Sequence, residues 1–367
     1  METLYEKIYN DLYCKIQTGR YAPGDVLPSE AALCGEYGVS RITAARALNE
    51  LRAAGLIERK KKKGSIVLPL PYSHRRSPHT IAVLFSDFAH FGKKIESTLA
   101  AYAKKRGYSV ACFDSGHSKT REREILKHLL SEKVSGLIIW PITRSSNLDI
   151  LARFAQEKTP MCFLDYSSYG MRSPCVCSDN FGGMYELTKH LIALGHRHIA
   201  YFPFKENFLP TEEERFSAYC RAIIESDAVL DPAYFIRMPP DIKNSTTENA
   251  SRYDRCAGSA VEHILSLPMR PTAVVCVNDE TAWHLIREAD KRGLRVPDDL
   301  SVTGFDNISV AAESEITTVS QDFGEMAKTA LNMLLRQIAE PSLINNFEGT
   351  SRIRSVIWDR GSTRRLP

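Results

Sequence analysis

The chain has 367 residues, 43% of them hydrophobic and 25% charged, which predicts two or three packed domains and excludes a disordered or fibrous protein. We expect a cytoplasmic protein with reduced thiols, because there is no membrane-length apolar stretch, no apolar signal segment, and no zinc-finger spacing among the nine cysteines. Residues 1–79 hold 13 Lys and Arg against 8 Asp and Glu, whereas the rest holds 35 against 36, so the basic head indicates a polyanionic partner.

The head shows the pattern of three short helices and a hairpin. Apolar residues at four-residue spacing predict a first amphipathic helix with the positions Leu4, Ile8, Leu12 and Ile16. Ser29 and Ser40 are typical N-caps of two further helices. Residues 56–59 and 65–68 predict two strands around a tight turn at 60–64. This order predicts a helix-turn-helix followed by a wing.

In a helix-turn-helix, the first turn of the second helix reaches the bases of the major groove. Here that turn contains Ser40, Arg41 and Thr43, and the Arg41 fork suits guanine or a phosphate. Four lysines at 60–63 precede Gly64 in the wing. A lysine run alone is usually a solvated turn, but behind a helix-turn-helix it indicates contact with the DNA backbone.

Residues 1–68 resemble the gluconate-repressor (GntR) family of winged-helix regulators. The stretches that carry the resemblance are YAPGDVLPSE at 21–30, YGVSRIT at 37–43, and Gly55-Leu56-Ile57. Where the family usually has arginines, this chain has Ala31 and Ala45, and we expect nearby cations to compensate. The resemblance and these cations together predict a DNA-binding set of Ser29, Glu30, Ser40, Arg41, Thr43, Arg46, Lys61, Lys63 and Gly64.

Residues 69–79 contain three prolines and no periodicity, which predicts a linker. Beyond it, apolar strand-like runs alternate with helical patterns, which is typical of parallel α/β architecture. The strand-like runs are 81–85, 136–140, 161–164, 198–202, 273–277 and 301–305. The helical patterns between them are 93–105, 121–131, 182–194, 257–265 and 281–292. This many strand-and-helix units exceed a single sheet, so we expect two halves, each with its own sheet, within one domain spanning 80–367.

Polar side chains follow several of these strands. Ser86 and Asp87 follow the first run, and Asp165, Asn278 and Asp306 follow later ones. In open α/β sheets, ligands bind beyond the carboxyl ends of the strands. One Asp after a strand is most often a turn or helix cap. Their recurrence at several strand ends favours a pocket for a polyol, whose hydroxyls both donate and accept hydrogen bonds.

The body resembles the effector domain of the LacI/GalR family from about residue 80 to 338, and this domain is similar to periplasmic sugar-binding proteins. The resemblance rests on the stretches 177–183, 194–200, 214–219, 277–279, 296–306 and 317–322. It implies two Rossmann-like lobes, lobe 1 at about 80–177 and 321–345 and lobe 2 at about 178–320, joined by crossovers near 177–179 and 319–321. It also implies an effector site that contains Ser86, Asp165, Arg215, Asn278, Asp306 and Gln321. Tyr253 is a further candidate, for stacking on an apolar sugar face, and Asp87 is included because it follows the first strand-like run.

A GntR-type head on a LacI/GalR-type body is similar to arabinose-repressor-like regulators. We therefore expect a homodimeric repressor that binds double-stranded operator DNA and a monosaccharide, with a pentose or deoxyhexose as the leading effector. An activator or corepressor-dependent regulator with another effector remains an alternative. An α/β enzyme is disfavoured because no phosphate-binding glycine loop or nucleophile elbow is present. We expect no cofactor and no metal, since His196 and His198 lack a third ligand at metal spacing.

Overall fold

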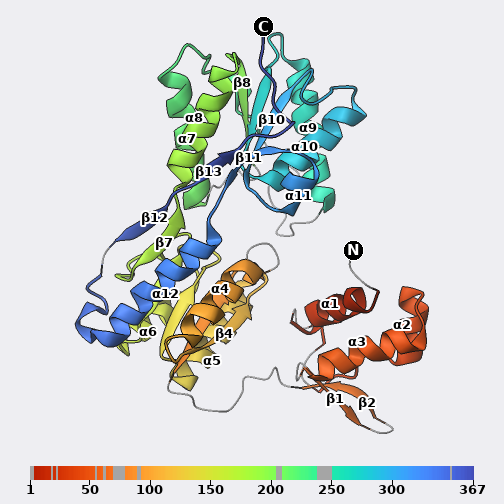
Figure 1. The fold of residues 1–367 in the computed structure, drawn as a ribbon, viewed down its shortest axis with the longest axis vertical. Coiled ribbons are helices and arrows are strands. Elements are labelled where there is room, and N and C mark those ends of the chain that lie inside the picture. Colours follow the sequence, from red (N-terminus) through yellow and green to blue (C-terminus); the bar gives the residue numbers. More distant parts are fainter. Residues whose placement is uncertain are drawn as a thin grey trace.

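The computed structural model describes residues 4–17, 20–21, 24–53, 56–60, 63–68, 79–88, 92–203, 209–237, 250–347 and 349–367, and every statement about structure below concerns these residues. A head of three helices and a hairpin precedes two lobes of alternating strands and helices (Figure 1). Most of the predicted linker lies outside the described residues. Among the described helices, none has the length and apolar character needed to cross a bilayer.

The head consists of α1 (Leu4–Gln17), α2 (Glu30–Tyr37), α3 (Arg41–Ala53), β1 (Ile57–Lys60) and β2 (Gly64–Val67). α2 begins where the Ser29 hydroxyl accepts the Ala32 N–H at 3.2 Å, and it ends at Gly38, whose φ of 63° is left-handed. Ser40 caps α3 by accepting the Thr43 N–H. The strands β1 and β2 are antiparallel. The helices share an apolar core that includes Ile8, Leu12, Leu33, Leu48 and Leu51. This arrangement is the predicted winged helix-turn-helix.

Lobe 1 is built on a six-stranded sheet in which every described pairing is parallel. In sheet order its strands are β12 (Thr350–Ile353), β7 (Cys175–Ser178), β6 (Met161–Leu164), β5 (Gly136–Ile139), β3 (Thr80–Phe85) and β4 (Ser109–Asp114). Helices α4 (Lys93–Lys104) and α12 (Phe323–Ala339) share one apolar cluster with the sheet. Helices α5 (Lys119–Glu132) and α6 (Leu148–Gln156) share a second cluster, so the lobe has three layers.

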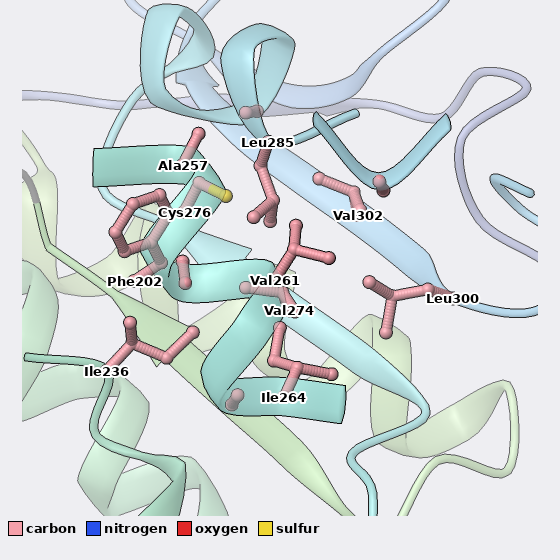
Figure 2. Packing of buried hydrophobic residues seen from close by; sticks show 14 of the residues in the cluster. Phe202, Ile236, Ala257, Val261, Ile264, Val274, Cys276, Leu285, Leu300 and Val302 are labelled. Atoms are coloured by element: carbon pink, nitrogen blue, oxygen red, sulfur yellow. The ribbon is translucent and has the colours of Figure 1, made fainter. Parts of the chain in front are cut away.

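Lobe 2 contains a five-stranded sheet with one antiparallel edge strand. Its order is β13 (Val356–Trp358), β11 (Thr317–Ser320), β10 (Ser301–Asp306), β9 (Ala273–Cys276) and β8 (Ile199–Phe202). One face packs against α7 (Asn180–Ala193) and α8 (Pro210–Ile224). The other packs against α9 (Ala250–Ser266) and α10 (Asp279–Lys291). Figure 2 shows Val261 and Ile264 of α9 meeting Val274 of β9 and Val302 of β10 in this second core. The helix α11 (Ser309–Glu313) and the turns η2 (Pro232–Tyr234) and η3 (Pro341–Leu343) complete the described helical elements.

Within the described residues, the chain passes between the lobes at three places. β7 belongs to the first sheet while α7 covers the second, and β11 belongs to the second sheet while α12 covers the first. These passages lie where two crossovers are expected. A third lies between β12, in the first sheet, and β13, in the second (Figure 1). Lobe 1 therefore continues to Ile353, beyond the predicted limit of 345, because β12 pairs with β7.

Some boundaries differ from the sequence predictions in ways that affect the site. β10 extends through Asp306, so this residue ends the strand rather than following it. α10 begins at Asp279, which makes Asn278 its N-cap. α9 begins at Ala250 rather than 257, so Tyr253 lies within a helix. The periodicity missed this first part of α9 because its polar residues hide the apolar stripe.

Candidate DNA-binding surface and effector site

The start of α3 presents its predicted DNA-reading residues to solvent. The Arg41 side chain is 82% exposed. Ser40 and Thr43 hydroxyls lie 2.9 Å apart, and the Ser40 oxygen also caps the helix. Ile42, between them, is 83% exposed although it is apolar. An exposed apolar residue next to an exposed guanidinium at a helix N-terminus suits a surface that meets base edges.

Glu30, the first residue of α2, pairs with arginines of both α3, the predicted recognition helix, and β1 of the wing. Its Oε2 accepts the Arg41 Nε–H at 2.9 Å, and its Oε1 accepts an N–H from Nη2 of Arg59 on β1. Nη1 of Arg59 donates to Asn49 of α3 at 3.1 Å. The two guanidinium groups hold the pKa of Glu30 below its usual range. Sequence analysis missed Arg59, because it stands beside the four wing lysines that dominate the charge pattern.

The remaining predicted DNA-binding residues lie at other points of the head. The guanidinium carbon of Arg46 lies 3.8 Å from the centre of the Tyr5 ring, and this cation–π contact connects α3 to α1. Lys63 is exposed at the wing turn, and Lys61 lies outside the described residues. Gly64 has φ of 87°, and a Cβ there would lie 2.9 Å from a Val26 methyl, so both the turn and the packing require glycine.

The body contains a buried network around Arg215 of α8. Its Nε donates to Asn180 Oδ1 at 2.9 Å, its Nη1 to the Val277 carbonyl at 2.7 Å, and its Nη2 to Asp306 Oδ1 at 3.1 Å. The guanidinium also lies 3.7 Å from the centre of the Phe305 ring. The Arg215 and Asp306 side chains are only 8% and 9% exposed. A buried ion pair with this many hydrogen bonds has a fixed geometry.

Gln321 extends this network from lobe 2 to lobe 1. Its Nε2 donates to Asp306 Oδ1 at 2.6 Å, and its Oε1 accepts the hydroxyl hydrogen of Ser178, the last residue of β7. Ser178 and Gln321 both lie at crossovers between the lobes. Sequence analysis did not select Ser178 or Asn180 as site residues, although both stand in the 177–183 stretch that carries the family resemblance.

Two further carboxyl groups, those of Asp165 and Asp279, lie near this network. Burial raises the pKa of Asp165 to about 7, although the positive charge of Arg215 acts to lower it. Burial also raises the pKa of Asp279 to about 8, with the nearby Asp306 acting in the same direction. Asp279 accepts the Thr318 hydroxyl and the Ile308 N–H, so it links α10 to β11 and to the start of α11. Sequence analysis did not select Asp279 as a site residue, although it stands in the 277–279 stretch that carries the family resemblance.

Other predicted effector residues have local contacts. Asn278 caps α10 by accepting the Thr281 N–H at 2.9 Å, which is the role most common for a polar residue after a strand. Asp87 lies 3.5 Å from His117 Nε2, and the Ser86 carbonyl accepts the His117 N–H.

Tyr253 is only 9% exposed and stacks on His284, with 5.0 Å between ring centres. One face of the Tyr253 ring is therefore already covered. The structure thus brings Arg215, Asp306 and Gln321 into one network, with Asp165 close enough to be influenced by Arg215 and Asp306. It places Ser86 and Asp87 with His117.

A second contact joins the lobes outside this network. Arg352 of β12 donates two hydrogen bonds of 2.7 Å to the carboxylate of Glu214 on α8. Within the part of the chain that the structure describes, no cluster of three or more metal-ligating side chains occurs. His196 instead contacts the Thr272 hydroxyl and the Arg364 carbonyl, and His198 contacts the Tyr234 hydroxyl.

Comparison with known proteins agrees with this architecture. Residues 4–67 match the bacterial regulatory proteins of the gntR family, and residues 188–363 match the periplasmic binding protein-like domain. The chain is 30% identical over 266 residues to the HTH-type transcriptional repressor PurR of Aliivibrio fischeri, covering 71% of this chain and 75% of that protein. It belongs to the LacI family of transcriptional repressors.

Another relative of this LacI-family chain matches along nearly its whole length. The arabinose metabolism transcriptional repressor of Geobacillus stearothermophilus is 29% identical over 352 residues, which is 92% of each chain. Among solved structures, a LacI family regulator from Enterococcus faecium with bound ribose has a TM-score of 0.61 at 23% identity, over 78% of this chain and 100% of that one. A transcription regulator from Lactobacillus plantarum has a TM-score of 0.64 at 22% identity, with the same coverage.

These findings confirm the predicted fold class, a winged helix-turn-helix ahead of a two-lobed α/β domain with parallel sheets. They also identify this LacI-family member as a DNA-binding transcriptional regulator of the repressor type and not an enzyme. The gntR-type head matches over the region where the three helices and the hairpin lie.

Proposed function

We propose that the protein is a cytoplasmic homodimeric repressor that binds a pseudo-palindromic operator and releases or tightens it when a small sugar binds between its lobes. Residues 1–68 form the DNA-binding domain, 69–79 the linker, and 80–367 the effector and dimerisation domain. A relative that spans 92% of the chain is named an arabinose metabolism repressor, and a structural neighbour holds ribose. A pentose or deoxyhexose is therefore the leading effector.

The observation that carries this proposal is the hydrogen-bonded path from Arg215 through Asp306 and Gln321 to Ser178. It runs from α8 of lobe 2 to the last residue of β7 in lobe 1. Carboxylate, amide, hydroxyl and guanidinium groups along it are those that recognise sugar hydroxyls. A sugar that exchanges hydrogen bonds with Asp306, Gln321 and Asp165 would favour one arrangement of the crossovers over another.

The response follows from differential affinity. A ligand that binds one arrangement of the lobes more tightly shifts the population toward it, and only by as much as that difference in affinity. In a dimer, the angle between the lobes sets the spacing of the two recognition helices. These helices must lie about one helical turn of DNA apart to occupy both half-sites. The DNA contacts are those proposed above for α3 and the wing, and phosphate neutralisation makes the affinity fall steeply with salt.

The test uses purified full-length protein. A random double-stranded DNA pool is first enriched for the sequence that the protein prefers. A panel of pentoses, hexoses, deoxyhexoses and their phosphates is then screened by thermal shift, since a ligand of the native state raises the melting temperature. We expect at least one unphosphorylated sugar to raise the melting temperature and to change the Kd for the enriched duplex. Absence of sequence enrichment, or of any sugar effect on DNA binding, would contradict the proposal.

A further inference from the structure

We infer that Glu30 acts as a positioning residue that aims Arg41 at a base pair, and that its carboxylate does not itself contact DNA. This inference rests on the proposed function of the head and assigns a role within it. The family resemblance places Glu30 at the DNA, but the structure places both of its oxygens on arginines of the protein itself.

The exposure and charge of the Glu30 carboxylate fit a role in holding Arg41 and not a role in contacting DNA. The Glu30 side chain is 18% exposed, whereas the Arg41 side chain that it holds is 82% exposed. An unpaired carboxylate at this surface would repel the phosphates of DNA. With Arg41 and Arg59 bound to its two oxygens, the three-residue group carries a net positive charge instead.

The atom through which Arg41 is held determines what it can do. Glu30 Oε2 accepts from Nε of Arg41 at 2.9 Å, and this hydrogen bond does not use the outer edge formed by Nη1 and Nη2. Two parallel N–H groups on this edge match the O6 and N7 acceptors of guanine. An exposed arginine that is not held in this way must lose much side-chain entropy on binding. A guanidinium fixed at Nε has lost part of it beforehand, which favours the bidentate contact.

Arg59 makes the arrangement rigid. It donates to Glu30 Oε1 from the wing strand β1 and to Asn49 Oδ1 from the same guanidinium, so the carboxylate is fixed to α3 as well as to α2. The direction of the Arg41 fork is thus set by three elements of the head. Loss of the carboxylate should therefore reduce discrimination at the base pair that Arg41 reads, more than it reduces binding to DNA in general.

Glu58 provides a matched control. It lies on β1, next to Arg59, and pairs with Lys60 at 2.9 Å, with both side chains 50% exposed. Replacing Glu58 by Gln removes the same charge from the same domain without touching the Arg41 contact. A change produced by Glu30→Gln but not by Glu58→Gln therefore reports the loss of positioning and not the loss of one negative charge.

The experiment measures Kd by fluorescence anisotropy with full-length protein. The DNA probes are the duplex enriched by the wild type, versions with each G·C pair of a half-site replaced by A·T, and an unrelated duplex of equal length. We expect Glu30→Gln to reduce the preference for the enriched over the unrelated duplex about 10-fold or more, and Glu58→Gln to leave this preference within about 2-fold. Affinity for the unrelated duplex should stay equal or rise in both variants.

The loss should appear at the same G·C pair at which Arg41→Ala loses discrimination, and Glu30→Gln should add nothing in an Arg41→Ala background. Glu30→Asp, which keeps the charge but shortens the side chain, should lose discrimination as Glu30→Gln does. Melting temperatures of the head variants establish that they fold. A Glu30→Gln preference equal to that of Glu58→Gln, or a further loss in the Arg41→Ala background, would overturn the inference. A wild type that enriches no sequence would instead refute the proposed function.

Discussion

The head and the body each contain an arginine paired with a carboxylate, but the two pairs differ in exposure. Arg41 of the head is 82% exposed and is held by Glu30 through Nε alone. Arg215 of the body is 8% exposed and donates to three different acceptors, including Asp306. The exposed pair leaves Arg41 N–H groups accessible to solvent, whereas the buried pair is part of the fold.

This difference in exposure predicts how much each arginine contributes to the stability of the fold. An exposed ion pair contributes little to stability, so the Arg41 side chain can be altered with little effect on the fold. A buried pair left with one partner keeps an uncompensated charge out of water, which is costly. We therefore expect head variants to separate DNA binding from folding, and body variants at Arg215 to affect both ligand binding and stability.

The largest effect is expected for Arg215→Ala. Removing the guanidinium takes one hydrogen-bond donor each from Asp306, Asn180 and the Val277 carbonyl, and it takes the positive charge from beside Asp306. The free energy of unfolding should therefore fall by about 3–5 kcal/mol. Urea unfolding measures this change. Arg215→Lys, which keeps the charge, should retain more of the stability and still lose the thermal shift given by the sugar. Wild-type stability in Arg215→Ala would show that the network does not hold the lobe together.

Arg41→Ala should have the next largest effect, confined to DNA. Loss of the exposed fork should weaken binding to the enriched duplex by about 1–3 kcal/mol for each half-site. The melting temperature and the response to the sugar should stay at wild-type values, because the side chain has no role in the core. Anisotropy and thermal-shift measurements on the same preparation check both parts, and an unchanged Kd would remove Arg41 from the interface.

Buried carboxyl groups of the body should make its stability depend on pH in the neutral range. The pKa of Asp279 is raised to about 8, so the folded state binds a proton that the unfolded chain releases above its ordinary pKa of 3.8. This contribution to stability is fully present below about pH 4 and is lost as the pH rises through about 8, with a slope of at most about 1.4 kcal/mol per pH unit. Unfolding of the wild type should therefore become easier between pH 6 and 8.

Asp279→Asn, which resembles the protonated acid, should flatten this dependence. Asp165, whose pKa is raised to about 7, acts in the same direction, so Asp165→Asn is the companion variant. Glu30 of the head has a lowered pKa and should add no change in this range. An Asp279→Asn variant with the same pH dependence as the wild type would contradict this assignment.

The smallest effect is expected at the second contact between the lobes. Arg352 and Glu214 are 45% and 33% exposed, so solvent screens their pairing despite its two short hydrogen bonds. Arg352→Gln should lower the free energy of unfolding by less than about 1 kcal/mol. A larger loss, measured by urea unfolding, would show that this ion pair and not the Arg215 network carries the connection between lobes.

The sequence predicts the head almost residue by residue, because caps such as Ser29 and Gly38 mark the helix ends. It predicts six strands of the body from their apolar runs, but these runs do not include the interior strands β7 and β11, whose short sequences contain serine and threonine. It misses β4, whose residues after Ser109 are only half-buried at a sheet edge, and the short edge strands β12 and β13, which have exposed positions. Edge strands lack the apolar pattern that burial on both faces imposes.

The residues of the candidate sites also include some that the sequence predicts and some that it misses. Arg215, Asp306 and Gln321 are found through family resemblance, and Asp306 also through its place at the end of an apolar run. Ser178 is missed because its contact with Gln321 joins residues 143 positions apart, which local patterns do not reveal. Helix periodicity likewise gives no sign that Arg59 and Arg41 share one carboxylate, since the three residues belong to three elements.

The central claim is that a small molecule bound by the body changes the affinity of the head for its operator. The most direct measurement is the Kd of the wild type for the enriched duplex, with and without a saturating concentration of the sugar that gives the largest thermal shift. We expect the two values to differ about 5- to 150-fold, the usual range of coupling between sites. Equal values would mean that the two regions act independently and would contradict this account.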